Sequence, residues 1–411
     1  MRRRERGSVF VLSLLVLTAL VAIVAGLAST NRSAVRAETN RMEERRARLM
    51  LESGIQRAIA ELQQQDLTRT TAHDPWNSLG DAGATEFTVG QDGFRIQLLD
   101  ASANAELNGL TEAQLRHLPL TQAQIDCFLD WKESAKTPRA QGAKDEYYNR
   151  LSKPYNAKLE PFDNVDELLM VKGFTYGTVY TLDRRETSVP LAAASVQMPI
   201  LADIVTVGSV SADKNINGKP KLDIGKATAD DLAQLGITKD IADTVMRNKS
   251  NYKKVSDLLK ISRLPSTAAR IFADNVTVGQ ETQQTGRINI NTATQAVLST
   301  IDGIEPDVAA AIVGRQSSGF RTLGELLDVP GIDVPKLAKF IDYLCVSSRT
   351  FTARIVGMAG RSRVAAEVQL VIDDDGGVKV TRWRPQDFWT IRDRWGWEKN
   401  STRQVVLGAT S

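Results

Sequence analysis

The chain has 411 residues, of which 42% are hydrophobic, and a formal net charge of +3. This length allows two or three domains, and the near-neutral charge excludes a protein that binds nucleic acid over its whole surface. Two cysteines exclude a disulfide-dense scaffold and a cysteine-rich zinc or iron–sulfur protein. The two histidines, His73 and His117, have no motif around them. A histidine metal site, a Ser-His-Asp triad and enzymatic activity in general are therefore not expected.

The N-terminus combines a short basic peptide with a long apolar segment. Residues 1–7 read MRRRERG, and residues 8–30 contain no charged residue. About 20 apolar helical residues cross a bilayer, and arginines ahead of the span favour a cytoplasmic N-terminus with the rest of the chain on the other side. Three interpretations are open: a signal peptide cut after Ala28, a one-span anchor, or a prepilin-type leader cut between Gly7 and Ser8.

The segment after the apolar run has a continuous helical pattern. Residues 31–62 contain no proline and many strong helix formers, and apolar residues recur at helical spacing from Leu51 to Leu62. The helix is expected to run from the membrane to about Gln65, as a rod on the order of 85 Å long. This continuity favours the prepilin-type interpretation over a cleaved signal peptide. A membrane anchor with a short coiled segment is the alternative.

The middle of the chain repeats itself. The segments at residues 224–261 and 290–329 match each other, each with a Gly-Ile turn ahead of a Leu-Leu element. A third copy of the Leu-Leu element occurs at residues 167–171. Repeats of this length predict stacked copies of one supersecondary unit, here short helices joined by tight glycine turns.

The repeats resemble helix-hairpin-helix modules, which are most often met in DNA-binding proteins. In those modules a Gly-hydrophobic-Gly hairpin offers backbone N–H groups to a phosphate. Here Thr238 and Glu305 stand where the second glycine would be, and a carboxylate repels phosphate. Basic and acidic side chains are also nearly balanced in the two repeats, which is too little charge for a phosphate-binding surface. The repeats are interpreted as structural or protein-binding, with DNA binding as the alternative.

Strand-like segments lie on both sides of the helical block. Residues 86–99 contain a Gln-Asp-Gly turn between alternating segments, which predicts a hairpin. Residues 351–357 and 363–372 also alternate, and an Asp-Gly-Gly turn leads into residues 378–383. We expect these strands to form one sheet of an α+β domain, with the helical block inserted between them. Two separate hairpins are the alternative, but lone hairpins are marginal in water.

Together these residues resemble one family, the K-type minor pseudopilins of the type II secretion system (general secretion pathway protein K, GspK). The resemblance covers most of residues 1–385. The matching elements are the basic leader with its apolar helix, residues 100–108, Asp130-Trp131, residues 142–148, 161–173 and 287–293, and the closing strands. The resemblance implies a pilin-like α+β fold, in which a long N-terminal helix and a small antiparallel sheet are interrupted by a large all-α (helix-hairpin-helix or SAM-like) insertion.

The expected organisation follows from these segments. It consists of a leader at 1–7, a transmembrane segment at 8–30, its helical continuation at 31–65, a split β domain at 66–100 and 350–385, a helical insertion at 101–349 with repeats at about 158–190, 221–279 and 287–346, and a tail at 386–411. The tail carries Trp389, Trp395 and Trp397. These side chains are expected to pack back onto the body, and an exposed interaction surface is the alternative.

The resemblance implies a structural role. Such a protein caps the tip of a short periplasmic pseudopilus, starts its assembly and supports the export of folded proteins across the outer membrane. The implied partners are the I- and J-type minor pseudopilins, the major pseudopilin, the inner membrane and prepilin peptidase, which would cut before Ser8 and methylate it. No nucleic acid is expected. The alternatives are a membrane-anchored DNA-uptake-like protein and a minor pilin of a type IV pilus.

The fifth position after the predicted cut supports the K type. Ordinary pilins carry glutamate there, where it neutralises the N-terminal amine of the neighbouring subunit in an apolar bundle. This chain has Leu12 instead. A subunit with nothing above it needs no such carboxylate, so Leu12 suits a filament tip.

The family also binds calcium near the Asp-Trp and Tyr-Tyr elements. Calcium needs about six to eight oxygen ligands, several of them carboxylate. The acidic side chains available for such a site are Asp130, Glu133, Asp145 and Glu146. Other residues stand where further acids would be expected, namely Lys132, Ala135 and Lys144. The sequence predicts a weakened calcium site or, alternatively, a loop held by the packing of Trp131, Tyr147 and Tyr148.

The two cysteines form a further candidate pair. Cys127 and Cys345 would both face an oxidising periplasm, where thiols that lie close enough form disulfides.

Overall fold

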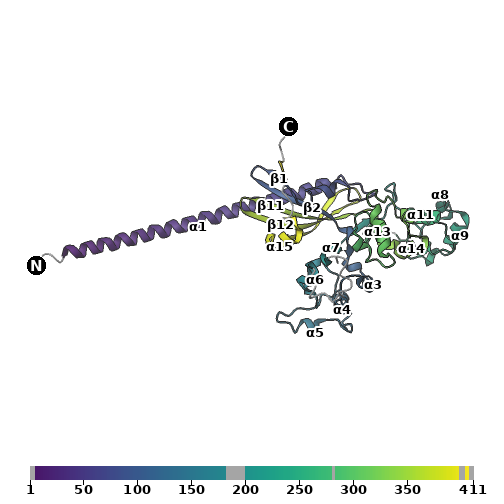
Figure 1. The fold of residues 1–411 in the computed structure, drawn as a ribbon, viewed down its shortest axis with the longest axis horizontal. Coiled ribbons are helices and arrows are strands. Elements are labelled where there is room, and N and C mark those ends of the chain that lie inside the picture. Colours follow the sequence, from purple (N-terminus) through teal and green to yellow (C-terminus); the bar gives the residue numbers. More distant parts are fainter. Residues whose placement is uncertain (1–4, 182–199, 280–282, 398–402, 407–411) are drawn as a thin grey trace.

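The first element of the computed structural model is one continuous helix. The model describes the chain except for residues 1–4, 182–199, 280–282, 398–402 and 407–411. Helix α1 (Glu5–Leu62) has 58 residues, and its N-terminal half projects from the molecule as a bare rod (Figure 1). The absence of proline and the run of helix formers explain this continuity. The expected rod is confirmed, and it ends at Leu62 rather than at about Gln65.

The second half of α1 packs on a six-stranded sheet with the order β13-β12-β11-β2-β1-β14. Its strands are β1 (Thr85–Val89), β2 (Asp92–Asp100), β11 (Thr350–Ala359), β12 (Ser362–Ile372), β13 (Val378–Gln386) and β14 (Arg403–Val406). In the centre β2 runs antiparallel to β11, with Asp100 opposite Phe351. Strands from before and after the helical block therefore form one sheet, as the sequence predicted, and the alternative of two separate hairpins is wrong.

Alternation along the strands directs one face of the sheet towards α1. In β12, Ala366, Val368, Leu370 and Ile372 are at most 1% exposed and belong to the same apolar cluster as Leu51 and other helix residues. Full burial of one large apolar side chain stabilises the fold by about 1.5–3 kcal/mol. The apolar interface (seam) between α1 and the sheet is therefore the main interaction that holds α1 in place.

The tail covers the opposite face of the sheet. Helix α15 (Phe388–Trp395) packs on β11 and β12, where Ile391, Trp395 and Trp397 cluster with Val356. Trp389 differs, because 71% of its surface is exposed. Two of the three tail tryptophans thus pack onto the body, as expected.

The block between β2 and β11 is built from short helices and two-residue or three-residue strands. Helix α2 (Pro75–Ser78) precedes the sheet and lies outside this block in the sequence. The helices of the block are α3 (Glu112–Leu115), α4 (Gln122–Lys132), α5 (Asp145–Tyr148), α6 (Tyr176–Tyr180), α7 (Leu201–Ile204), α8 (Ala229–Gln234), α9 (Lys239–Arg247), α10 (Val255–Leu259), α11 (Ser266–Asn275), α12 (Gln295–Leu298), α13 (Pro306–Arg315) and α14 (Val334–Phe340). The 3-10 helices include η3 (Val165–Met170) and η6 (Leu323–Asp328). The short strands pair as β3 (Ala105–Glu106) with β4 (Val205–Thr206), β5 (Val210–Ala212) with β8 (Gln283–Thr285), β6 (Leu222–Asp223) with β7 (Val276–Thr277), and β9 (Ile288–Asn289) with β10 (Leu344–Cys345).

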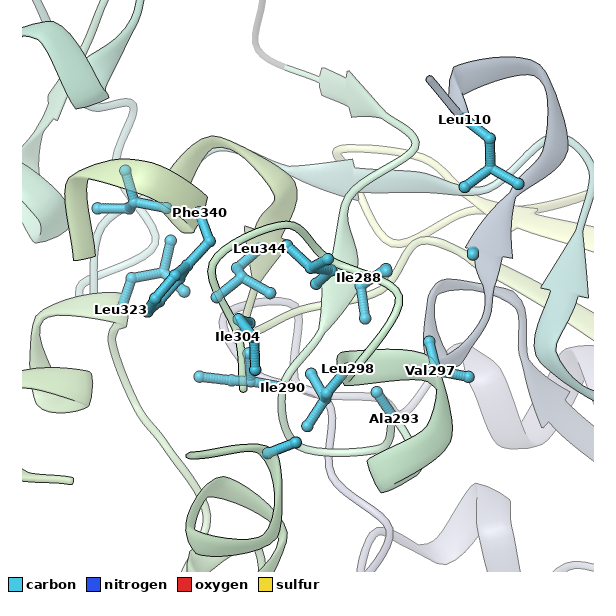
Figure 2. Close-up of a cluster of buried hydrophobic side chains, with 14 of the residues drawn as sticks. Leu110, Ile288, Ile290, Ala293, Val297, Leu298, Ile304, Leu323, Phe340 and Leu344 are labelled. Carbon is cyan, nitrogen blue, oxygen red and sulfur yellow. The ribbon is translucent and has the colours of Figure 1, made fainter. Parts of the chain in front are cut away.

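The repeats have the form that the sequence predicted. Gly236 follows α8 with φ +88° and Gly303 follows α12 with φ +89°, a backbone conformation that favours glycine. The earlier Leu-Leu copy is η3, followed by Gly173 at φ +87°. Figure 2 shows the core of the second repeat, in which Ile290, Leu298 and other apolar side chains point towards one another between the short helices. The two long repeats pack together, since α10 contacts α14 and α11 contacts η6.

Candidate functional site

The first candidate site is the bare half of α1. Among the described residues this is the one helix long and apolar enough to cross a bilayer, and none of its apolar window is buried within the molecule. Leu12 is 64% exposed. The structure places Gly7 and Ser8 at the start of the same helix, and residues 1–4 of the predicted leader lie outside the described residues. The chain thus presents a single apolar rod to a membrane or to other helices.

A second site lies where the helical block joins the sheet, and it brings together two of the stretches that carry the family resemblance. Asp100, at the end of β2, is only 6% exposed. Its carboxylate accepts hydrogen bonds from Asn289 Nδ2 at 3.0 Å, Thr292 Oγ1 at 2.6 Å, Ser348 Oγ at 2.8 Å and the backbone N–H of Ser102 at 2.8 Å. Burial raises the pKa of Asp100, and the donors oppose that rise.

The stretch after Asp100 continues this junction. The Glu106 carboxylate accepts from the backbone N–H of Ser209 at 2.8 Å and from its hydroxyl at 3.1 Å. Asn108 forms two hydrogen bonds with the backbone of Phe162, at 2.9 and 2.7 Å. Burial raises the pKa of Glu106. The resemblance singles out this stretch, but its role as a buried polar connector has no signal in the residues themselves.

The residues predicted to bind calcium lie around the loop between α4 and α5. Two of them form ion pairs with the same arginine. Asp130 is 1% exposed and accepts from the backbone N–H of Arg139 at 3.0 Å and from its Nη1 at 3.2 Å. The same guanidinium donates to both oxygens of Glu133, at 2.7 and 3.1 Å. Both carboxylates therefore already have protein donors, although one guanidinium carries only one positive charge against two negative charges.

The other two acids are also bound to protein donors. Asp145 Oδ1 accepts from the backbone N–H of Ala157 at 2.8 Å. Glu146 pairs with Arg150 at 2.6 Å on the surface. In the described part of the chain, no group of three or more His, Cys, Asp or Glu residues is placed to hold a metal ion. This donor set does not fit a calcium ion.

Aromatic packing accompanies the same loop. Trp131 meets Tyr148 edge to face, with ring centroids 5.3 Å apart, and its Nε1 donates to Glu167 at 2.8 Å. Tyr147 lies at the surface, 39% exposed. The loop is thus fixed at one side by a buried tryptophan and tyrosine.

The two cysteines of the candidate pair are not joined in the structure. Cys127 and Cys345 are both free and buried. They belong to different elements, α4 and β10, and each thiol has its own neighbours: Cys127 Sγ donates to the carbonyl of Gln141 at 3.5 Å, and Cys345 lies beside Ser211. Burial raises the pKa of Cys127 to about 11 and that of Cys345 to about 12, which disfavours the reactive thiolate form of both.

Two hairpins of the second repeat place an acidic residue at the start of a helix. Glu305 stands at the N-cap position of α13 without a side-chain cap hydrogen bond, whereas Asp333, which no sequence motif marks, caps α14 and accepts from the N–H of Lys336. Each places a carboxylate where phosphate would bind. Arg263, at φ +59°, takes the turn position between α10 and α11 that a glycine holds in the other hairpins. The geometry favours a structural or protein-binding role over DNA binding.

Comparison with known proteins agrees with this description. The family model for protein K of the type II secretion system (first domain) matches residues 96–187, and a helix-hairpin-helix model matches residues 283–345. Among solved structures, this chain is similar in fold to a chain in the crystal structure of the GspK-GspI-GspJ complex from the enterotoxigenic Escherichia coli type 2 secretion system. That match has a TM-score of 0.51 and 13% identity, and covers 87% of this chain and 99% of the other.

Curated relatives match over a small part only. The endonuclease/exonuclease/phosphatase family domain-containing protein 1 of Xenopus laevis is 36% identical over 104 residues, which is 25% of this chain and 17% of the relative. Its Homo sapiens counterpart is 35% identical over 97 residues, 23% of this chain and 16% of the relative. The chain therefore spans less than a fifth of the length of these relatives, and the activity in their names is not assigned to it. The protein K domain model over residues 96–187, the fold shared with the solved structure and the helix-hairpin-helix repeats make this chain similar to the K-type minor pseudopilins of the type II secretion system.

Proposed function

We propose that this chain sits at the tip of the type II secretion pseudopilus, where it starts and caps assembly and supports the export of folded proteins. It is anchored in the inner membrane by α1, with its bulk in the periplasm. Its neighbours are the major pseudopilin and the I- and J-type minor pseudopilins, and the similarity to a chain of the GspK-GspI-GspJ complex supports the latter two. The chain acts as a structural part rather than as an enzyme.

One structural observation supports the tip position above all. The helical block lies beyond the sheet, at the end of the molecule opposite the bare half of α1 (Figure 1). When apolar helices bundle side by side in a fibre, this block extends to the membrane-distal side of its own sheet, where the next subunit would have to sit. A subunit of this shape can end a fibre but obstructs stacking within one.

The second support is chemical. An unpaired charge inside an apolar helix bundle is costly, so a subunit inside a fibre benefits from a carboxylate that meets its neighbour's terminal amine. Leu12 supplies no carboxylate. A subunit with no neighbour above it has no terminal amine to neutralise and therefore needs no carboxylate at this position.

The test is to locate and count this chain in pseudopili. Fibres are overproduced, and a tag at the exposed Asp375, in the turn between β12 and β13, is labelled with gold. We expect one label at one end of each fibre. Labels that repeat along the fibre would overturn the proposal, as would a strain that lacks this chain yet makes fibres and secretes cargo at the normal rate.

A further inference from the structure

A buried lysine lies at the centre of the loop that the family resemblance assigns to calcium. Lys144 is 6% exposed, and its ammonium donates to the main-chain carbonyl of Asp130 and to that of Glu133, the latter at 2.9 Å. Main-chain carbonyls and carboxylates are the oxygens that calcium uses. Here the compact cation of a lysine, with its three donors, binds such oxygens itself.

A second internal cation holds the carboxylates of the same two residues. The Arg139 guanidinium bridges Asp130, at 3.2 Å, and Glu133, at 2.7 Å. The two acids thus face two fixed positive charges, and the group is balanced without an added ion. A divalent cation would have to displace both before it gained enough ligands.

The loop is also closed tightly around Asp130. A Cβ on Gly142 would lie 1.8 Å from Asp130 Oδ2, so the backbone occupies the space beside this carboxylate. Calcium needs about six to eight oxygens at roughly 2.3–2.6 Å around it. The space beside the Asp130 carboxylate is thus filled, and its oxygens are already bound to Arg139.

We propose that Lys144 and Arg139 are the resident cations of this loop and that the loop keeps its shape without calcium. Both cations are side chains of the protein itself. Through hydrogen bonds and ion pairs they hold the end of α4 close to the start of α5, as a bound metal would do by coordination. This inference does not rest on the tip position, because it concerns the chain's own stability.

The experiment compares local protection in the full chain, purified in detergent. Hydrogen–deuterium exchange is followed in peptides that cover residues 133–150, in excess EGTA and in millimolar CaCl₂. The variant is Lys144→Met, and the matched control is Lys136→Met, a change of an exposed lysine in the same loop. A second variant, Arg139→Gln, addresses the guanidinium, which is less buried, should Lys144→Met fail to fold.

We expect the wild type to exchange equally in EGTA and in CaCl₂. Lys144→Met and Arg139→Gln should speed exchange in the loop by about tenfold or more in EGTA, since each loses a buried contact, while Lys136→Met leaves it unchanged. Two results would overturn the proposal: loop protection in the wild type that rises with calcium, or exchange in Lys144→Met and Arg139→Gln that matches the Lys136→Met control.

Discussion

Asn289 donates its side-chain amide to the carboxylate of Asp100 at 3.0 Å, although the two residues are 189 positions apart. Asp100 ends a strand of the sheet, and Asn289 belongs to β9 in the second repeat. The same amide donates to the backbone carbonyl of Thr70 at 3.1 Å. The helical block is therefore held to the pilin-like part by a buried polar network, which has directional geometry that apolar contacts lack.

Replacing Asn289 with alanine should loosen this junction. The change leaves the Asp100 carboxylate with one donor fewer in a buried site and is expected to lower the free energy of unfolding by about 2–4 kcal/mol. Urea unfolding of the full chain in detergent measures it. Asn217→Ala, at an exposed asparagine of the same block, is the control and should change little. Equal stability of the two variants would contradict the structural role of the junction.

Glu106 should make stability depend on pH. Burial raises the pKa of Glu106 in the folded chain, so the folded chain holds this proton more tightly than the unfolded chain. Its favourable contribution is complete below the ordinary glutamate pKa and is lost as the pH rises through the raised, folded-state value. Glu106→Gln removes this loss. The free energy of unfolding of the variant, relative to the wild type, should therefore rise as the pH increases from the ordinary glutamate pKa through the raised pKa of Glu106, by about 1.4 kcal/mol per unit of pKa elevation.

The control for Glu106 has the opposite sign. The hydrogen bond from Arg116 lowers the pKa of Glu112, an exposed residue in α3. Its contribution is present above the ordinary glutamate pKa and is lost as the pH falls through the lowered value. Glu112→Gln should therefore lose a little stability at neutral pH and none in acid. A Glu106→Gln profile that follows the Glu112→Gln profile would show that the Glu106 site is not a buried acid in solution.

The sequence predicted most of the fold because local signals and burial agreed. The alternation that ends at Ile372 marked the face of β12 that packs on α1, and the Gly-Ile turns at Gly236 and Gly303 marked the hairpins. These features depend on residues that are neighbours in the chain. Periodicity and turn chemistry are sufficient to identify them.

The contacts that define the candidate sites are harder to predict, because they join residues that are distant in the sequence. Nothing near Asp100 indicates that Asn289 will meet it. Cys127 and Cys345 look like a pair in the composition but are buried in separate elements. In the sequence Lys144 is a residue that opposes calcium, and only the folded loop shows that its ammonium binds main-chain carbonyls. Sequence patterns carry no information on such tertiary partners.

The seam between α1 and the sheet should be sensitive to a single methyl group. A Cβ on Gly357, in β11, would lie 2.0 Å from the backbone oxygen of Ala47 and 2.5 Å from the backbone nitrogen of Leu51. Backbone atoms cannot rotate away, so Gly357→Ala must push the helix off the sheet, at a cost of about 2 kcal/mol or more. In the control Gly314→Ala, on α13, the new Cβ meets nothing within 4 Å. That change should be neutral or stabilise by up to about 1 kcal/mol, and urea unfolding of both variants measures the difference.

Processing at the N-terminus provides a direct prediction about maturation. Mass spectrometry of the chain from its native membrane should find a first residue Ser8 that carries an added methyl group. Gly7→Val should leave the leader uncut, because the cut requires a small residue before it. Gly26→Val, in the apolar run beside the signal-peptide site, is the control and should mature normally. A mature chain that begins at Ser29 would contradict the prepilin-type interpretation and indicate ordinary export.

Leu12 offers the sharpest test of the tip position. Leu12→Glu places a carboxylate inside the apolar helix bundle. At the tip no subunit lies above to pair its terminal amine with this carboxylate. An uncompensated buried charge costs several kcal/mol, so we expect fewer pseudopili and at least a severalfold loss of cargo secretion, measured in culture supernatants. Leu12→Met keeps the apolar character and should secrete normally. If Leu12→Glu secreted like the wild type and its label appeared along the fibres, the carboxylate would have found a partner above it, and the absence of glutamate could no longer explain why this subunit ends the fibre.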